Sequence, residues 1–322
     1  MTQSAQAPDP AQKSRQMSDV VRAYGIHLVL LMLVVVTSIL SPAFLAANNI
    51  SNMLLQAAPL GIVVIGQVLV ILVRGLDLSV ASVMATAAVV ATSFNGQDSD
   101  ALSVFFVALA IGLATGLLNG FLITKRNVSP FLATLATMTL LQGMRFAYTQ
   151  GAPSGNVPPI YRVLGSQTFY GVPYNLMILI VLAAVFSILL HKTTYGRRVY
   201  LTGGNPVMAR LVGIRADRIT MASYVISGGL AALAGLIYSG FVGIVDNWVG
   251  RGFELDSIVA AVMGGVALSG GRGSIFGGLL GATILVVVFN AVLMIGLPIQ
   301  FQIIIKGLVI VIAAAFYVRR TA

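Results

Sequence analysis

The sequence predicts an all-α membrane protein with about ten transmembrane helices. Hydrophobic residues make up 58% of the chain and charged residues only 9%. Apolar runs of about 17–25 residues recur along the chain, and a helix of that length crosses the hydrocarbon layer of a membrane. We therefore expect one helical membrane domain over residues 26–318 rather than a soluble β or α/β domain.

Turn residues divide the apolar part of the chain into ten candidate spans. These lie at 26–41, 51–73, 78–94, 101–123, 128–149, 173–190, 219–243, 255–269, 274–296 and 300–318. The segment 1–25 is rich in Ala, Gln, Ser, Asp and Pro, which favours a disordered N-terminus. The apolar run that follows shows no small-residue cleavage site, so it is interpreted as a retained span rather than a signal peptide.

The basic residues indicate how the chain is oriented. With a cytoplasmic N-terminus, fifteen of the nineteen fall in inside segments, including the tail 319–322, and Arg145, Arg162 and Arg251 fall outside. Lys306 lies within the last span. This excess predicts that both termini are cytoplasmic. The net charge of +10 does not indicate nucleic-acid binding, because the basic residues sit in short loops between apolar spans.

The longest polar segment, 192–218, carries six basic residues. Asn205 is a typical N-cap, Pro206 suits the first helical position, and Gly213 can end a helix in a left-handed conformation. Between them, one helix face collects Val207, Met208, Leu211 and Val212. The segment therefore predicts a short amphipathic helix on the cytoplasmic side.

Small residues at four-residue spacing predict close contacts between helices. They occur in the fourth span as Gly112, Gly116 and Gly120, in the seventh as Ser227, Ala231, Gly235 and Ser239, and in the ninth as Gly273, Gly277 and Gly281.

The sequence offers little for catalysis or for metal binding. There is no cysteine, and His27 and His191 stand alone at span ends. The glycine-rich stretch 270–278 lacks the Lys-Ser/Thr ending of a P-loop. We expect no cofactor on this chain, so an ATP-driven transporter built on it needs a separate ATPase that binds ATP and Mg.

A few polar groups fall within the apolar spans, where they are costly and usually face the bundle interior or water. Arg74 and Asp77 are three residues apart and could pair, while Glu254 and Asp256 open the eighth span. The candidates for a substrate pathway are Gln67, Asp77, Asn119, Gln142 and Asn290. The alternative for each amide is an interhelical hydrogen bond. Lys306 is interpreted as a residue that snorkels to the membrane interface or takes part in a structural ion pair.

Three ordered segments resemble those of ribose-type permeases of ABC importers. They are GLDLSVASVMA at 75–85, GGNPVMARLVGI at 203–214 and FELDSIVAAVMGGVALSGGRGS at 253–274. The similarity extends from about residue 25 to 318, although Ala81 replaces a glycine and Pro206 an often polar residue of the family pattern.

This resemblance implies a type II ABC importer-like permease fold in the bacterial inner membrane. It implies two permease subunits, identical or sister chains, on two ATPase subunits, and a periplasmic binding protein that delivers a pentose or related sugar. Segment 192–218 then resembles the coupling loop, which carries the ATPase-docking role to Asn205, Pro206, Ala209, Arg210, Leu211, Gly213 and Ile214.

Three other interpretations stay open at this point. An ABC permease for branched-chain amino acids or nucleosides would share the same glycine-rich segments. An ion-coupled secondary transporter usually has more deep charges and discontinuous helices in corresponding halves. A membrane scaffold without transport would leave the short amphipathic helix unexplained.

Overall fold

The computed structural model describes residues 30–32, 34–305 and 307–308. Lys306, the N-terminal segment 1–25 and the tail 319–322 lie outside these residues. The bundle is formed by α2 (Ala47–Leu72), α3 (Val80–Thr92), α4 (Ala101–Lys125), α5 (Pro130–Thr149), α7 (Tyr174–Lys192), α10 (Ala216–Val242), α11 (Phe253–Met263) and α12 (Ile275–Met294).

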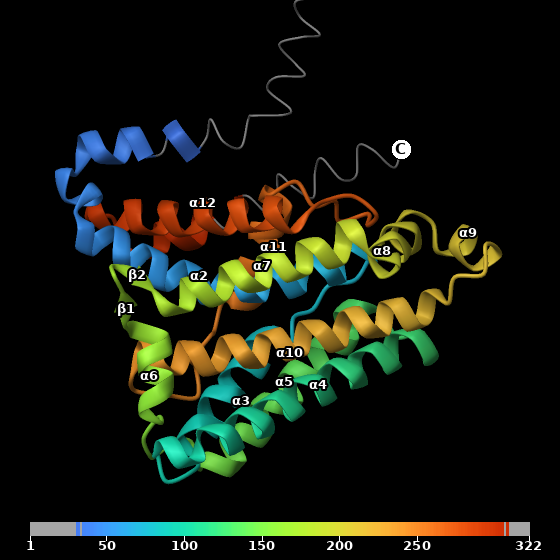
Figure 1. The fold of residues 1–322 in the computed structure, drawn as a ribbon, viewed down its shortest axis with the longest axis horizontal. Helices are drawn as coiled ribbons and strands as arrows, with labels where there is room; N and C mark the ends of the chain where they lie inside the picture. The colour runs from blue at the N-terminus through green and yellow to red at the C-terminus, as the bar shows by residue number, and fades with distance from the viewer. Residues whose placement is uncertain (1–29, 33, 306, 309–322) are drawn as a thin grey trace, which may run out of the picture.

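Short elements lie at the two ends of this bundle. In Figure 1, α8 (Thr194–Gly204) and α9 (Pro206–Leu211) extend from one end, and α6 (Pro159–Ser166) lies at the other. Beside α6, β1 (Thr168–Phe169) pairs antiparallel with β2 (Val172–Pro173). Two 3₁₀ turns, η1 (Pro42–Leu45) and η2 (Asp98–Asp100), precede α2 and α4.

Five of the described helices are long and apolar enough to cross a membrane: α2, the continuous η2–α4 helix, α7, α10 and α12. The predicted spans at 78–94 and 255–269 are wrong in extent, because their helices α3 and α11 have only 13 and 11 residues. Each short helix follows a non-helical stretch, which we call the first break (residues 73–79) and the second break (residues 243–252).

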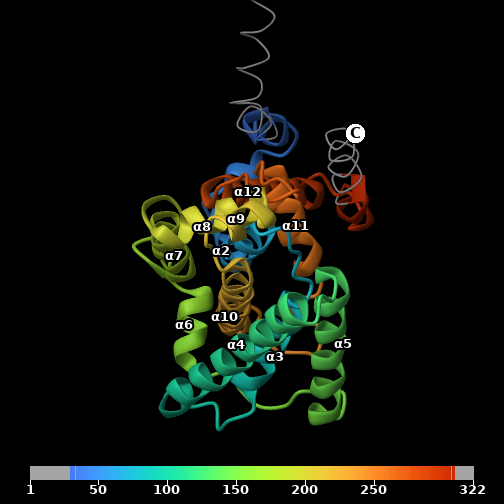
Figure 2. The ribbon, with the colours of Figure 1, turned by 90° about the vertical axis from the view of Figure 1, so that its right-hand side faces the viewer.

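The centre of the bundle is formed by α2 and α10. Every α2 residue from Ala58 to Leu72 is buried, and α10 packs against α4, α2 and α3. Figure 2, which views the bundle from the end that carries α8 and α9, shows α10 between α2 and α4.

Glycines set the closest helix approaches. A Cβ added to Gly112 or Gly116 would overlap the carbonyl oxygens of Gly228 or Tyr224 in α10, and one at Gly120 would press on Met221. Gly277 and Gly281 approach Gly264 and Ala260 in the same way. Gly273 does not share their helix, because Ser274 caps α12 and Gly273 lies before it with φ 137°.

Candidate functional site

The first break begins where α2 ends in a left-handed residue. The N–H groups of Arg74 and Gly75 donate to Ile71 O and Val70 O, the pattern of a Schellman cap, which usually has glycine at the left-handed position. Here Arg74 adopts φ 67°. A non-glycine residue in this conformation is strained, so other contacts must hold it there.

Those contacts come from the end of α8. The Arg74 Nε donates to Gly203 O at 2.6 Å, and one terminal nitrogen donates to Gly204 O. The possible Arg74–Asp77 pair does not form, because the guanidinium donates to these carbonyls instead. A positive charge is favourable at a helix C-terminus, so Arg74 ties the first break to α8.

Asp77 lies in the first break at 1% exposure. Its Oδ1 accepts from the N–H and the hydroxyl of Ser79 at 3.0 and 2.6 Å, and its Oδ2 accepts from Ser227 Oγ at 2.8 Å. Tyr224 OH donates to the Leu76 carbonyl at 3.2 Å. Backbone that is not helical leaves polar groups that must be satisfied inside a membrane protein, and these residues satisfy them.

The network continues through two further predicted residues. Asn119 Nδ2 donates to Ser79 Oγ at 2.9 Å and its Oδ1 accepts from Thr137 Oγ1 at 2.8 Å. Gln67, in the amide orientation that satisfies both groups, donates to Asp77 O at 3.1 Å and accepts from its N–H at 3.3 Å. Gln67, Asp77 and Asn119 therefore belong to one buried hydrogen-bond network that joins α2, α4, α5 and α10.

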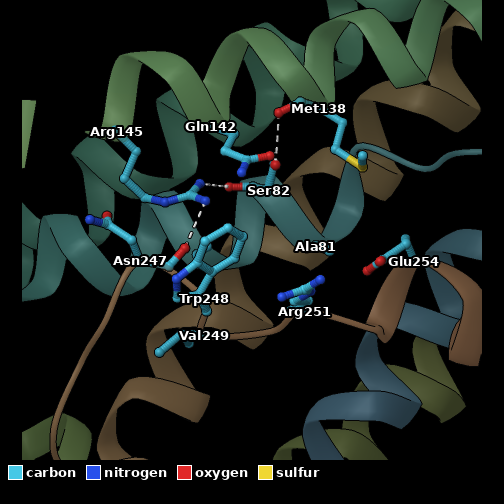
Figure 3. A pocket seen from close by; sticks show the side chains of 11 residues that line it. Ala81, Ser82, Met138, Gln142, Arg145, Asn247, Trp248, Val249, Arg251 and Glu254 are labelled. Carbon is cyan, nitrogen blue, oxygen red and sulfur yellow. Dashed lines mark hydrogen bonds between the residues drawn. The ribbon is translucent and has the colours of Figure 1, made fainter. Parts of the chain in front are cut away.

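Gln142 and Asn290 lie elsewhere. Asn290 exchanges hydrogen bonds of 3.0 and 2.8 Å with Asn49, next to η1, so it fits the alternative of an interhelical hydrogen bond. Gln142 lines a pocket of about 390 Å³ between α3, α5 and the second break (Figure 3). The eleven lining residues are Ala81, Ser82, Ala85, Met138, Gln142, Arg145, Asn247, Trp248, Val249, Arg251 and Glu254.

Arg145 joins the pocket walls. It is 5% exposed, and its terminal nitrogens donate to Ser82 O and Thr86 Oγ1 at 3.3 Å and to Asn247 O at 2.9 Å. Its buried Nε has no hydrogen-bond partner among the described residues. The guanidinium therefore fastens the second break to α3 through backbone carbonyls.

The second break supplies the floor of the pocket. Trp248 packs edge-to-face on Phe146, with ring centroids 5.4 Å apart, and the Arg251 guanidinium lies 4.9 Å from the Trp248 ring. Left-handed Gly250 and Gly252 lead into α11, where Glu254 accepts the Gly252 N–H at 2.8 Å. Figure 3 shows Gln142 and Ser82 on the side of the pocket opposite Trp248 and Arg251.

The polar segment folds as predicted around α9. Asn205 Oδ1 accepts from the N–H groups of Val207 and Met208 at 3.0 and 3.1 Å, Pro206 is the first helical residue and Gly213 has φ 81°. The predicted face is exposed: Val207, Met208, Leu211 and Val212 are 56–75% accessible.

The seven predicted docking positions differ in accessibility. Ala209 is buried at 3%, so its side chain is not available to a partner, and Arg210 is held by Asp217 at 2.9 Å. Leu211 is the exposed apolar member of the set. Asn205, Pro206 and Gly213 set the ends of α9, and the N–H of Ile214 closes its C-terminus on Ala209 O.

The polar segment 192–218 is packed tightly against the bundle. A Cβ on Gly203 would overlap Leu72 O, and the Gly271 N–H donates to that same carbonyl at 2.9 Å. Burial raises the pKa of Tyr200, and its neutral hydroxyl donates to Gly273 O at 2.9 Å. We call this meeting of α2, α8 and the 270–273 loop the glycine junction.

Sequence reasoning missed Arg145, Trp248 and Arg251 as parts of one pocket and treated both arginines as outside charges. A repeated pattern would have pointed to the two short helices that flank this pocket, α3 and α11. Segments 76–84 and 255–263, LDLSVASVM and LDSIVAAVM, share Leu, Asp, Val, Ala, Val and Met in register. Corresponding discontinuous segments in two halves are a pointer to a transporter's binding site.

Comparison with known proteins places the chain in a family. Residues 49–314 match the family described as branched-chain amino acid transport system / permease component. The ribose import permease protein RbsC of Bacillus subtilis (strain 168) is 36% identical over 97% of both chains. RbsC of Escherichia coli (strain K12) is 38% identical over 88% of this chain and 90% of that protein.

The galactose/methyl galactoside import permease protein MglC of Salmonella typhimurium is 33% identical, over 90% of this chain and 92% of that protein. No solved structure matches the chain. The family match covers most of the chain, and the relatives are more than 30% identical to it. The chain therefore belongs to the permease family described as branched-chain amino acid transport system / permease component.

Proposed function

We propose that this chain is the permease subunit of an ABC importer for a small sugar. The relatives named for sugar import span nearly the whole chain, which favours ribose or a related monosaccharide over a branched-chain amino acid. The chain then works in the bacterial inner membrane as one of two permease subunits, identical or sister chains. A periplasmic binding protein delivers the sugar, and ATP and Mg are bound by partner ATPases.

The observation that carries the coupling part of this proposal is α9. Its apolar face is exposed at the end of the molecule farthest from α6 and the β hairpin (Figure 1), and an exposed apolar patch with a polar rim marks a protein contact. The basic residues around it favour a cytoplasmic location for this end by the positive-inside rule. The exposed face of α9 is therefore the ATPase-docking surface.

We expect the transporter to work by alternating access. ATP binding draws the two ATPases together, and α9 passes the motion through the glycine junction to α2 and the first break. Energy enters because the ATPase contacts differ between the two states. The ten-span topology with both termini cytoplasmic and the domain limits 26–318 belong to the same proposal.

Replacing Leu211 by Asp, alone and together with Val207→Asp, tests the docking surface. Both side chains are exposed, so we expect normal membrane abundance but loss of ATPase co-purification and of ATP-driven ribose uptake. Tyr170→Asp, a change at a still more exposed side chain in the hairpin at the other end, should retain the ATPase. Undiminished co-purification and uptake in the double variant would refute the docking surface.

A further inference from the structure

The pocket between α3, α5 and the second break has free hydrogen-bonding capacity of both kinds. Gln142 makes no hydrogen bond to another described residue, and its amide offers donors and an acceptor. Glu254 uses one carboxylate oxygen for Gly252, which leaves its second oxygen as an acceptor. A ligand hydroxyl, which donates and accepts, matches this mixture.

An aromatic face completes the lining. Trp248 is 48% exposed and is the only tryptophan of the chain. Its contacts with Phe146 and Arg251 fix the ring without covering it fully. A large, rigid aromatic surface suits the C–H face of a sugar ring, while polar groups on the other side fix the ring's orientation.

The charges in the pocket favour a neutral ligand. The terminal nitrogens of Arg145 already donate to Ser82, Thr86 and Asn247, and Arg251 lies over the Trp248 ring near the acidic Glu254. The Arg251 guanidinium makes no hydrogen bond to another described residue, but Glu254 in the same lining carries the opposite charge. A phosphate or carboxylate that bound Arg251 would also meet this carboxylate, whereas a neutral ligand would not be repelled. The cavity of about 390 Å³ falls within the range of roughly 300–1,000 Å³ for small-molecule sites.

We propose that this pocket holds one monosaccharide during translocation, with the ring against Trp248 and hydroxyl groups bonded to Gln142 and Glu254. The proposal rests on the proposed sugar-import function. It assigns the permease itself a low-affinity site between the two short helices, because Ala81, Ser82 and Ala85 come from α3 and Glu254 from α11. A shift of the second break changes the distance between the Trp248 and Gln142 walls.

The single tryptophan provides a direct test. The full chain, reconstituted in lipid nanodiscs, is titrated with D-ribose, D-galactose, L-leucine and inorganic phosphate while tryptophan fluorescence is recorded. We expect a saturable change with a monosaccharide only. Gln142→Ala should weaken the apparent affinity about tenfold, as expected for losing one or two hydrogen bonds, and Glu254→Gln should weaken it less.

Gln56→Ala is the matched control, because Gln56 is exposed on α2 and lies outside the pocket. Its titration should equal that of the unmodified chain. ATP-driven uptake by cells that carry the complete importer is measured in parallel. Ribose uptake without any saturable fluorescence change would overturn the pocket and leave the proposed function standing.

Two other outcomes also overturn the pocket proposal. A response to phosphate alone would identify an anion site, and a response to leucine alone, together with leucine uptake, would overturn the sugar-import function as well. An unchanged affinity in both Gln142→Ala and Glu254→Gln would show that the fluorescence change arises elsewhere. Equal melting temperatures for the variants and the unmodified chain exclude unfolding as the cause of lost binding.

Discussion

The first and second breaks carry the same residue pattern and end in different structures. In the first, Asp77 precedes α3 by three residues and its oxygens accept hydrogen bonds from Ser79 and Ser227. In the second, the corresponding Asp256 lies inside α11, whose first residue is Phe253. The shared pattern fixes a short helix in both places, whereas the upstream residues decide where each helix begins.

The upstream residues differ in their backbone chemistry. Before α3, the left-handed residue is Arg74 and the next helix begins six residues later. Before α11, left-handed Gly250 and Gly252 lead directly into Phe253, and Glu254 accepts the Gly252 N–H. The polar groups of the first break are consequently satisfied by the hydrogen-bond network around Asp77. The second break instead lines a pocket. We interpret the first as a fixed joint and the second as the ligand-facing segment.

The largest effect is expected at Asp77. Asp77→Ala leaves the Ser79 N–H, the Ser79 hydroxyl and the Ser227 hydroxyl without their acceptor, at a cost of about 1–3 kcal/mol for each buried donor left unpaired. We expect a large fall in melting temperature and loss of folded protein from the membrane. The measurement is thermal unfolding followed by size-exclusion chromatography in detergent.

Asp77→Asn serves as the comparison for that change. The amide keeps one oxygen for Ser79, so it should lose less stability than the alanine variant. If Asp77→Ala melts like the unmodified chain, the first break is not held by this network and the contrast between the two breaks fails.

The next effect is expected at the glycine junction, where the chain supplies a matched pair. Gly203→Ala drives a Cβ into Leu72 O, whereas the Cβ of Gly204→Ala meets no atom within 4 Å. We expect Gly203→Ala to destabilise the chain by about 1–3 kcal/mol, the usual cost of overpacking, and to lower ribose uptake. Gly204→Ala should melt and transport normally.

Both variants are compared by melting temperature and by ATP-driven uptake at equal membrane abundance. Equal behaviour of the pair would mean that the approach of α8 to α2 is not a constraint, and the path from α9 to the first break would lose its support.

Much of the difference between the first and second breaks could not be predicted from the sequence. Hydropathy located the helices and Asn205, Pro206 and Gly213 predicted α9, because these signals depend on neighbouring residues. Span length was overestimated because the predicted spans run past the end of α11 to residue 269 and past both ends of α3. Hydropathy does not distinguish apolar residues beside a helix from residues within it. A pair between Arg74 and Asp77 was left possible because only their sequence distance was known. The carbonyls that Arg74 does bind, of Gly203 and Gly204, are about 130 residues away.

The candidate site was also predictable only in part. Buried amides were recognisable as polar groups in apolar spans, but the sequence did not separate Gln142, which lines the pocket, from Asn290, which pairs with Asn49. Arg145 and Trp248 come together only through the path of the second break. Which side chains share a cavity depends on tertiary contacts between segments about 100 residues apart, and helix periodicity carries no information about these.

The smallest effect on stability is expected at the second break, with a larger effect on transport. In Arg145→Lys the charge remains, but a single ammonium group does not reproduce the fork that reaches Ser82, Thr86 and Asn247 together. Each hydrogen bond lost costs about 0.5–1.5 kcal/mol, so the chain should stay folded with a modestly lower melting temperature. Ribose uptake should fall several-fold, because the Asn247–Trp248 wall is no longer fastened to α3.

Arg162→Lys, an exposed change in α6, is the control for this variant and should leave uptake unchanged. The two breaks are distinguished by how the effect on stability compares with the effect on transport. Asp77→Ala should abolish folding and transport together, while Arg145→Lys should lower transport in protein that remains folded. An Arg145→Lys variant that unfolds as readily as Asp77→Ala would make the second break a structural joint like the first. Unchanged uptake in folded Arg145→Lys protein would instead show that transport does not depend on how the pocket wall is fastened.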